Sequence, residues 1–353
     1  MLATSTARVR LGGAPRRAPR ARGRARTRHA LVLTRAAASG GGGGDDVDEN
    51  GGERRPSTAS STSALSLLCP LLKVFSGGDA AAPRNRALEV TTSGLASMSR
   101  MPHGVTVDAE CAERAPSSHH PSRRIVLYEF EACPFCRRVR EALTQLDLSV
   151  EVRPCPKDAR VHRAEVEALG GKQSFPFLVD PNGDGGDGVA MYESEDIVRY
   201  LYANYGNGAA VPETILSTTA LTGWMPTLLR AGRGMTRYAT APEFGRAEDD
   251  DDGGGGGGGG RRPLTLYNYE GNQFARLARE ALCELEIPYV LANAGKGSPR
   301  RAELTALDPG ASVPYLIDPN TGTKLGESEE IVGYLFRTYG GEGAVAVAAG
   351  GAE

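Results

Sequence analysis

The stretch IVLYEFEACPFCRRVREALTQL, residues 125–146, indicates a strand, a short loop and a helix in succession. Its first four residues, Ile125–Tyr128, form an apolar run. Pro134 suits the first position of a helix, and apolar residues follow it at helical spacing: Val139, Ala142, Leu143 and Leu146. We therefore expect a helix that starts at Pro134, with Cys133 as its N-terminal cap.

The two cysteines of this stretch, Cys133 and Cys136, predict a redox-active pair. Unpaired backbone N–H groups and the helix dipole stabilise a thiolate at a helix N-terminus, and Arg137 and Arg138 are expected to add positive charge. Such surroundings lower a cysteine pKa from about 8.5 to roughly 3.5–7.5. We expect Cys133 to face solvent and to act as the nucleophile. Cys136, one turn later and less exposed, is placed to resolve a mixed disulfide formed on Cys133.

Zinc binding and chance are the alternative explanations of two such close cysteines. A structural zinc site needs four ligands, and the chain has no second close cysteine pair to complete one. His119 and His120 adjoin a stretch rich in proline and serine, which makes them poor candidates. We therefore expect thiol chemistry and no metal.

Residues 1–44 have the composition of an organelle transit peptide. They contain ten arginines and no lysine or acidic residue, among serine, threonine, alanine and proline. A basic arm that binds nucleic acid is the alternative. Without these arginines, 31 basic residues remain against 43 acidic ones, so the rest of the chain carries about −12 and is unsuited to nucleic acid or an anionic membrane. We expect a chloroplast protein, with the mitochondrion as the alternative, and no transmembrane segment.

Two further regions are predicted to lie outside any folded domain. Residues 45–122 are rich in glycine, serine, proline and mixed charge without sustained periodicity, which predicts a disordered linker. Within them, the apolar piece Ala64–Phe75 is too short and broken to span a bilayer. Residues 207–262 predict an inter-domain connector, with a helix over Glu213–Leu229 and then an acidic and polyglycine run. Residues 342–353 predict a disordered tail.

The chain contains an internal duplication. Leu127–Leu146 matches Leu266–Leu285 at ten of twenty positions without a gap, far above chance. The later segments that correspond are Ser174–Asn182 with Ser312–Asn320, and Glu193–Gly206 with Glu327–Gly340. Each copy predicts a strand, a helix, a strand and a helix, followed by a proline-led hairpin of two strands and a closing helix. We call residues 123–206 unit 1 and residues 263–341 unit 2.

Both units resemble the thioredoxin-like domain of glutaredoxins and of the N-terminal half of glutathione transferases. The Cys-Pro-Phe-Cys motif, the proline that opens the third strand and the Glu-Ser pair before the last helix carry the resemblance, which covers residues 124–206 and 264–340. Within that family, the chain looks like the tandem thioredoxin-like proteins of plant and algal chloroplasts, and unit 1 is also similar to the glutaredoxin-like domain of membrane-associated prostaglandin E synthase 2. The resemblance implies an α/β fold class: two thioredoxin-like folds in tandem, each a mixed four-stranded sheet flanked by helices, joined by a flexible linker.

The resemblance also implies where the cysteinyl part of glutathione binds. Pro176 and Pro314 are expected to be cis, so that the backbone of the preceding residues, Phe175 and Val313, can hydrogen-bond this part of the tripeptide. The alternative is a trans proline at an edge strand.

The pairs Glu193-Ser194 and Glu327-Ser328 correspond to the residues that bind the γ-glutamyl group in the family. Ser194 is expected to cap a helix whose free N–H groups take up the γ-glutamyl carboxylate, while Glu193 pairs with the ammonium. A helix cap without a binding role is the alternative.

Two departures limit the resemblance. We expect neither unit to be followed by the all-helical domain that forms the pocket for the electrophilic substrate in glutathione transferases. In unit 2 the motif is Asn-Gln-Phe-Ala at residues 272–275, so both thiols are absent there. Cys283 is expected to be a packed or surface residue and Cys155 a loop residue. Cys69 and Cys111 lie in the predicted linker, where we expect no chemistry.

Unit 1 is therefore expected to be a glutathione-linked, glutaredoxin-like thiol–disulfide oxidoreductase in which Cys133 attacks and Cys136 resolves. Glutathione is the expected co-substrate, and glutathionylated or disulfide-bearing proteins are the expected partners. Unit 2 is expected to be a degenerate partner. One alternative is a non-catalytic tandem scaffold that binds glutathione or a protein. Another is an isomerase similar to prostaglandin E synthase 2.

Overall fold

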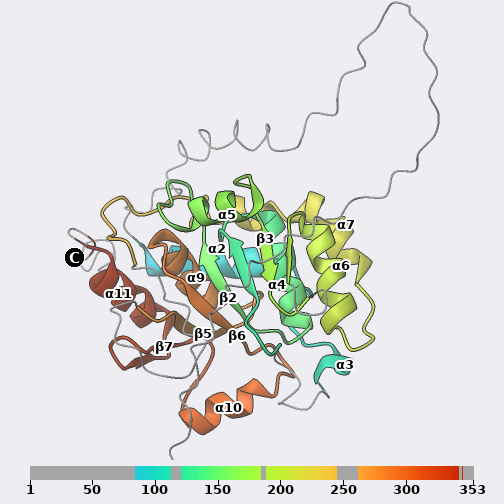
Figure 1. Cartoon of the computed structure of the whole chain (residues 1–353). Helices are drawn as coiled ribbons and strands as arrows, with labels where there is room; N and C mark the ends of the chain where they lie inside the picture. Colours follow the sequence, from blue (N-terminus) through green and yellow to red (C-terminus); the bar gives the residue numbers. More distant parts are fainter. Residues whose placement is uncertain (1–83, 113–120, 184–187, 245–260, 342–343, 345–353) are drawn as a thin grey trace, which may run out of the picture. The chain divides into compact units, whose positions relative to one another are not determined.

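A computed structural model describes residues 84–112, 121–183, 188–244, 261–341 and 344 (Figure 1). In unit 1 the elements are β1 Val126–Glu129, α4 Pro134–Gln145, β2 Val150–Pro154, α5 His162–Gly170, β3 Phe177–Asp180, β4 Val189–Met191 and α6 Ser194–Tyr205. Unit 2 repeats this order with β5 Leu264–Asn268, α9 Gln273–Glu284, β6 Tyr289–Asn293, α10 Arg300–Leu307, β7 Tyr315–Asp318, β8 Thr323–Leu325 and α11 Ser328–Tyr339. The predicted order of strands and helices is confirmed in both units.

The apolar periodicity of each motif helix places its stripe in the core. On α4 the four stripe residues named above, Val139 to Leu146, are fully buried, and on α9 the corresponding Ala278, Ala281, Leu282 and Leu285 are buried as well. All of them belong to one hydrophobic cluster that includes residues of both units. The burial of this stripe is what period-3.6 apolar spacing predicts, whereas the burial of charged residues such as Arg140 and Arg279 on the same helices is not.

Each unit contains a mixed four-stranded sheet. In unit 1, β1 pairs parallel with β2 and antiparallel with β3, and β3 pairs antiparallel with β4. In unit 2, β5, β6, β7 and β8 pair in the same pattern. This is the thioredoxin-like sheet that the resemblance implies.

The two sheets join into one. β2 pairs antiparallel with β6, and Glu151 lies opposite Val290, its own counterpart in the repeat. The result is an eight-stranded sheet in the order β4-β3-β1-β2-β6-β5-β7-β8, whose central strands are visible in Figure 1. Because equivalent edge strands meet antiparallel, the two units are related by a local two-fold, as in an isologous dimer.

The predicted disorder of residues 45–122 is wrong for the part of this segment that the structure describes. Helix α2, Arg86–Met98, is capped by Asn85, whose side chain accepts from the Leu88 N–H at 3.1 Å. It packs on α9 and on α8, Met225–Leu229. Arg84 also binds Glu284 of unit 2 at 2.7 Å. The polar composition of this segment suggested disorder, because the residues that pair with its charged side chains are distant in the sequence.

The connector is helical where a helix was expected over Glu213–Leu229, but it forms two helices, α7 Glu213–Thr222 and α8, separated by Gly223 and Trp224. A short helix, α3 Ala109–Ala112, precedes unit 1. The expected transit peptide, the apolar piece Ala64–Phe75 and the acidic and polyglycine run lie outside the described residues. Within the described part of the chain, no helix is long and apolar enough to cross a membrane.

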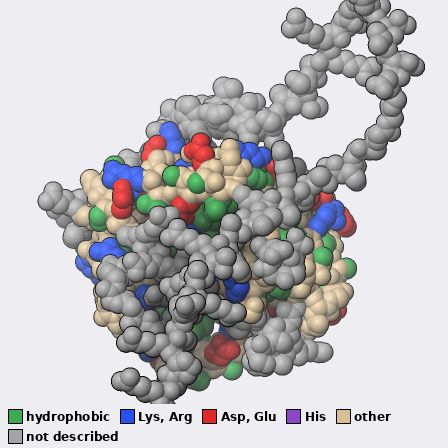
Figure 2. Space-filling view, viewed as in Figure 1, with side chains coloured by type: hydrophobic (Ala, Val, Ile, Leu, Met, Phe, Trp, Pro, Cys, Tyr) green, Lys and Arg blue, Asp and Glu red, His purple; other side chains and the backbone are tan. Residues whose placement is uncertain are grey.

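Surface charge is mixed on the face that Figure 2 presents. Basic and acidic side chains alternate there with apolar and uncharged polar ones over the described residues. Surfaces that attract nucleic acid accumulate positive charge. The described part of this face shows no such accumulation of charge of one sign.

Candidate functional site

Cys133 is the N-cap of α4, as predicted. Its backbone is extended (φ −74°, ψ 121°), Pro134 occupies the first helical turn, and the Cys133 Sγ accepts a hydrogen bond from the Cys136 N–H at 3.3 Å. The loop before it is closed by the Cys133 N–H, which donates to the Phe130 oxygen at 3.0 Å. The strand, loop and helix thus bring a thiol to the helix N-terminus, where a thiolate is stabilised.

The surroundings drive the two thiols in opposite directions. Burial alone disfavours a thiolate at Cys133, but hydrogen bonds from the Cys136 thiol and from backbone N–H groups outweigh it, so the pKa of Cys133 is lowered. Burial raises the pKa of Cys136 well above its ordinary value, and its hydrogen bond to Cys133 raises it further. The pair therefore consists of one ionisable thiol and one thiol that holds its proton.

Two expectations about Cys133 are wrong, and the first concerns its exposure. The Cys133 side chain does not face solvent, because the residue is only 4% exposed. Cys136 is fully buried. The connector, which sequence reasoning did not bring to this site, contacts both flanks of the thiol. Thr227 of α8 donates to the Ala132 oxygen at 2.6 Å, and the Trp224 ring meets Phe135 edge-on at 6.4 Å between centroids.

The second concerns Arg137 and Arg138, which do not supply charge to the thiol as expected, since other groups engage both guanidinium groups. Arg137 pairs with Glu270 of unit 2 at 3.2 Å and donates to the Gly223 oxygen at 3.0 Å. Arg138 donates to the hydroxyl of Ser194 at 3.2 Å and to Thr219 Oγ1 at 2.9 Å. The cap hydrogen bonds, and not these arginines, account for the lowered pKa of Cys133.

The peptide bonds Phe175–Pro176 and Val313–Pro314 are both cis, as expected. In unit 1, the Phe175 ring packs edge-on against Phe130 at 6.2 Å between centroids, so the proline loop lies beside the loop that carries Cys133. The guanidinium group of Arg163, on α5, lies over the Phe175 ring, 4.9 Å from its centroid. The structure therefore brings two of the predicted parts of the unit 1 site together.

Ser194 is not the cap of α6, contrary to expectation. The helix begins at Ser194, its N-cap is Glu193, and no side chain caps it. The Ser194 hydroxyl instead accepts the hydrogen bond from Arg138 on α4. Glu193 has φ 65°, uncommon for a residue with a side chain, whereas Glu327 in unit 2 is extended at φ −81°. After the turn at Glu193, Ser194 is already the first helical residue and is not the cap.

The Glu-Ser pair of unit 2 has a different setting. Glu327 is the N-cap of α11 without a side-chain cap bond, and Ser328 is the first helical residue. Leu277 stands on α9 where Arg138 stands on α4, and a leucine cannot donate a hydrogen bond to a serine hydroxyl. The repeat therefore keeps the pair but not the arginine behind it.

The motif position of unit 2 is a capping asparagine beside a cavity. Asn272 Oδ1 accepts from the N–H groups of Phe274 and Ala275, both at 2.9 Å, and its Nδ2 donates to the Val313 oxygen at 3.2 Å. The cavity has a volume of about 340 Å³ and is lined by Tyr269, Asn272, Arg301, Leu304, Thr305, Ala311, Ser312 and Val313. Unit 2 thus keeps the cap geometry and a hollow without a nucleophile.

The remaining described cysteines are packed residues. Cys111, Cys155 and Cys283 are buried. Burial raises the pKa of Cys155 and of Cys283 well above the ordinary value. Cys69 lies outside the described residues. Among the residues that the structure describes, no group of three or more His, Cys, Asp or Glu side chains could hold a metal ion.

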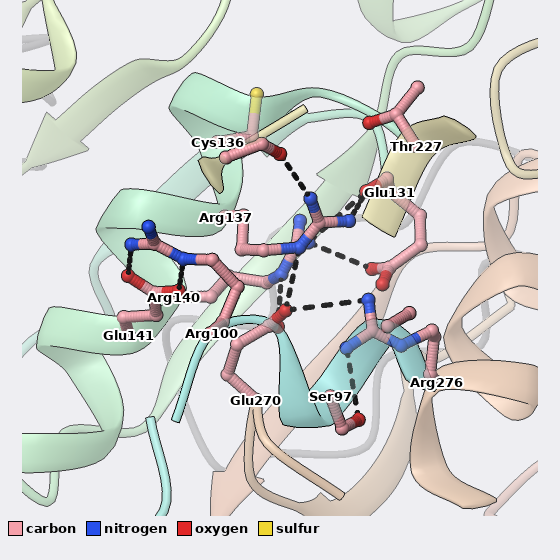
Figure 3. A network of polar contacts seen from close by, with 12 residues as sticks. Ser97, Arg100, Glu131, Cys136, Arg137, Arg140, Glu141, Thr227, Glu270 and Arg276 are labelled. Carbon is pink, nitrogen blue, oxygen red and sulfur yellow. Dashed lines mark hydrogen bonds and ion pairs between the residues drawn. The ribbon is translucent and has the colours of Figure 1, made fainter. Parts of the chain in front are cut away.

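Buried charges connect the motif loops of the two units, which sequence reasoning missed. Arg279 of unit 2 binds Glu131 of unit 1 at 3.0 Å, and Arg140 of unit 1 binds Glu270 of unit 2 at 2.7 Å. Figure 3 shows the arginines of both helices converging on Glu270, with Arg276 extending to Ser97. The signal was present in the repeat, because glutamate and arginine occur at these same two positions in both units.

Burial and charge act differently on the carboxyl groups of this network. Burial raises the pKa of Glu129 to about 7, although Arg140 pairs with it. For Glu270, burial also disfavours the charge, but Arg140 and Arg279 outweigh it and lower the pKa. Four arginines lower the pKa of Glu270, whereas at Glu129 the neighbouring carboxylates Glu131 and Glu270 add to the effect of burial and oppose the arginines.

The fold and the site define a class: two thioredoxin-like α/β domains in one chain, the first with a thiol pair at the N-terminus of its motif helix. A family model described as glutathione S-transferase, N-terminal domain, matches residues 127–209 and again residues 266–343. Each unit therefore has the thioredoxin-like fold of that domain. Comparison with curated proteins found no match, and comparison with solved structures found none.

Proposed function

We propose that unit 1 is a glutathione-linked thiol–disulfide oxidoreductase. The observation that carries this proposal is the contrast between its thiols, with the pKa of Cys133 lowered and that of Cys136 raised. An attacking sulfur must be a thiolate near neutral pH, whereas a resolving sulfur acts only after the mixed disulfide has formed. The match of unit 1 to the glutathione S-transferase N-terminal domain supports glutathione as the thiol that enters the reaction.

In the proposed reaction, the Cys133 thiolate attacks the glutathionyl sulfur of a protein–glutathione disulfide. A Cys133–glutathione disulfide forms, and the protein sulfur leaves as a thiolate. A glutathione thiolate then attacks the glutathionyl sulfur, which releases glutathione disulfide and restores the Cys133 thiolate. With a protein disulfide as substrate, the Cys133 thiolate attacks one of its sulfurs and the other leaves as a thiolate. Cys136 then attacks the Cys133 sulfur of this mixed disulfide, and the second protein sulfur leaves as a thiolate. Two glutathione molecules reduce the resulting Cys133–Cys136 disulfide and leave as glutathione disulfide.

Glutathione is proposed to lie along the backbone of Phe175 and Pro176 with its γ-glutamyl end at Glu193 and Ser194. Helix α6 has no side-chain cap, so its first N–H groups are available to a carboxylate. Arg138 supports the same assignment, because it brings a cation to the Ser194 hydroxyl. Glu193 supplies an anion for the γ-glutamyl ammonium.

The burial of Cys133 favours a second candidate, a non-catalytic tandem scaffold that binds glutathione or a protein. A thiol that is 4% exposed is poorly placed to meet a bulky disulfide substrate. The two candidates differ in turnover, because a scaffold binds glutathione without transferring sulfur.

The test is deglutathionylation of a glutathionylated peptide by the purified chain with glutathione as reductant. Cys133→Ser is expected to abolish turnover, whereas Cys136→Ser is expected to retain it, because this reaction needs only the attacking sulfur. Cys155→Ser is the matched control, since that buried thiol with a raised pKa is expected to have no role. Equal loss in both motif variants would support a reductase that works only as a dithiol. Saturable glutathione binding without turnover in the unsubstituted chain would support the scaffold.

A chloroplast location is proposed from the composition of residues 1–44, which lie outside the described residues. Fusion of this segment to a fluorescent protein tests it in plant cells by microscopy. Plastid fluorescence is expected, mitochondrial fluorescence would support the alternative organelle, and diffuse cytosolic fluorescence would contradict the transit peptide.

A further inference from the structure

Glu131, two residues before Cys133, is held at each of its polar groups. Its N–H donates to Cys283 Sγ at 3.4 Å, and its backbone oxygen accepts from Arg140 at 3.2 Å. Its carboxylate accepts from Nε and Nη2 of Arg279 at 3.0 and 3.1 Å and also pairs with Arg140 of unit 1 at 3.2 Å. Arg279 and Cys283 both belong to α9. Unit 2, which has no motif thiols, therefore supplies two of the anchors of the loop that carries the thiol.

The Arg279–Glu131 contact is built to hold a geometry. Both residues are almost fully buried, at 1% and 2% exposure, and the guanidinium meets the carboxylate with two parallel N–H groups. Such two-pronged contacts fix orientation as well as distance. The remaining donors of Arg279 bind Asn268 Oδ1 and the backbone oxygens of Tyr269 and Glu270, so the arginine itself is fixed within unit 2.

The same anchors occur in the opposite direction. Glu270, the counterpart of Glu131, donates its N–H to Thr144 Oγ1 at 3.2 Å and binds Arg140 of unit 1. Thr144 is the counterpart of Cys283, so the sulfur of Cys283 stands where unit 1 has a hydroxyl acceptor. The Cys283 sulfur therefore acts as a hydrogen-bond acceptor that holds the motif loop of unit 1. Because only the loop of unit 1 leads to a thiol, the exchange has a chemical consequence in unit 1 alone.

We propose that Arg279 of unit 2 is a positioning residue for the thiol site of unit 1, acting through Glu131 to keep the Cys133 sulfur within reach of the Cys136 N–H. The inference rests on the proposed function, because it assumes that Cys133 reacts as a thiolate. Unit 2 then serves the reaction as the part that sets the geometry of the thiol loop, with no sulfur chemistry of its own.

Loss of this anchor is expected to change reactivity through one hydrogen bond. Without Arg279, the loop is attached to α9 only through Cys283, while Arg140 of α4 keeps its contacts with the Glu131 carboxylate and backbone oxygen. The orientation of the loop, and with it the position of the Cys133 thiolate at the helix N-terminus, is then held less tightly. A hydrogen bond to a charged group is strong enough to shift an equilibrium about tenfold. We therefore expect an alkylation rate of Cys133 about tenfold lower at pH 7, and a pH profile displaced to higher pH.

The experiment uses the full chain with Glu131→Gln and Arg279→Met combined, so that neither charge is left buried alone. Iodoacetamide alkylation of Cys133 is followed against pH by peptide mass spectrometry, and thermal unfolding is measured separately. The matched control is Arg100→Met with Glu141→Gln. That pair is equally buried, is joined at 2.8 and 2.6 Å, and involves α4 itself. The control is expected to lower Tm but to keep the alkylation profile.

Arg279→Lys is the conservative variant. Lysine keeps the charge but cannot make the two-pronged contact, so we expect a smaller displacement of the profile than in the double variant. This variant also serves as the test if the double variant does not fold.

Three results would decide against the inference: a native profile in the folded double variant, a native profile in Arg279→Lys when the double variant does not fold, or an equal displacement in the Arg100 and Glu141 control. Failure of the proposed function is distinguishable from these results. In that case, the unsubstituted chain itself shows no Cys133 alkylation below about pH 8, the range expected of a low-pKa thiol.

Discussion

Asn272→Cys tests whether unit 2 keeps the geometry that stabilises a thiolate. A sulfur at this position is expected to accept the two N–H groups that now donate to Asn272 Oδ1, both at 2.9 Å. Each hydrogen bond to a charged group contributes about 1.5–3 kcal/mol, and one pKa unit corresponds to about 1.4 kcal/mol. Burial opposes the charge, because Asn272 is only 9% exposed. We expect the opposing effects to leave a pKa of roughly 7, below the usual value of about 8.5.

The assay is the pH dependence of alkylation of the new thiol in a Cys133→Ser background. The matched control is Thr305→Cys, an exposed position of α10 on the same cavity, where an ordinary cysteine pKa is expected. Removal of the asparagine cap is expected to reduce stability by about 1 kcal/mol, measured by urea unfolding. A folded Asn272→Cys variant whose introduced thiol titrates at or above about 8.5 would refute the reasoning. Ala275→Cys can then be added to ask whether the restored pair forms a disulfide.

Two further predictions concern unit 1. Burial raises the pKa of Glu129 to about 7 from an ordinary 4.5. Between these pH values the folded chain keeps a proton on Glu129 that the unfolded chain has released. The free energy of unfolding that this proton contributes is therefore lost as the pH rises from 4.5 to 7. Glu129→Gln is expected to remove this loss, on the order of 3 kcal/mol, and equal pH dependence of urea unfolding in both proteins would contradict it. Arg138→Leu places at this position the leucine that unit 2 has at Leu277, and it removes the hydrogen-bond donor to Ser194. We expect this variant to raise KM for glutathione about tenfold with little change in kcat. An unchanged KM would exclude Arg138 from glutathione binding.

The local structure of each unit could be predicted from the sequence because it depends on residues close together in the chain. The apolar spacing after Pro134 defines α4, and Cys133 caps it as expected. The duplication predicted the succession of strands and helices along the chain in both units, and the resemblance implied the cis peptide bonds before Pro176 and Pro314. The helix, its cap and the succession of elements arise from periodicity, capping and turn chemistry, which operate within a few residues, whereas the cis bonds were expected from the resemblance alone.

The tertiary structure alone decided how the candidate site is enclosed and held. The pairing of β2 with β6, the exchange between Glu131 and Arg279, and the Thr227 contact beside Cys133 join residues that lie about a hundred or more positions apart. A buried glutamate and an exposed one are indistinguishable in a sequence without knowledge of the facing surface. For this reason α2 looked like linker, Cys133 looked exposed and Arg137 looked free to serve the thiol. The sequence determined which residues could do the chemistry, and the packing of one unit against the other determined their burial and partners.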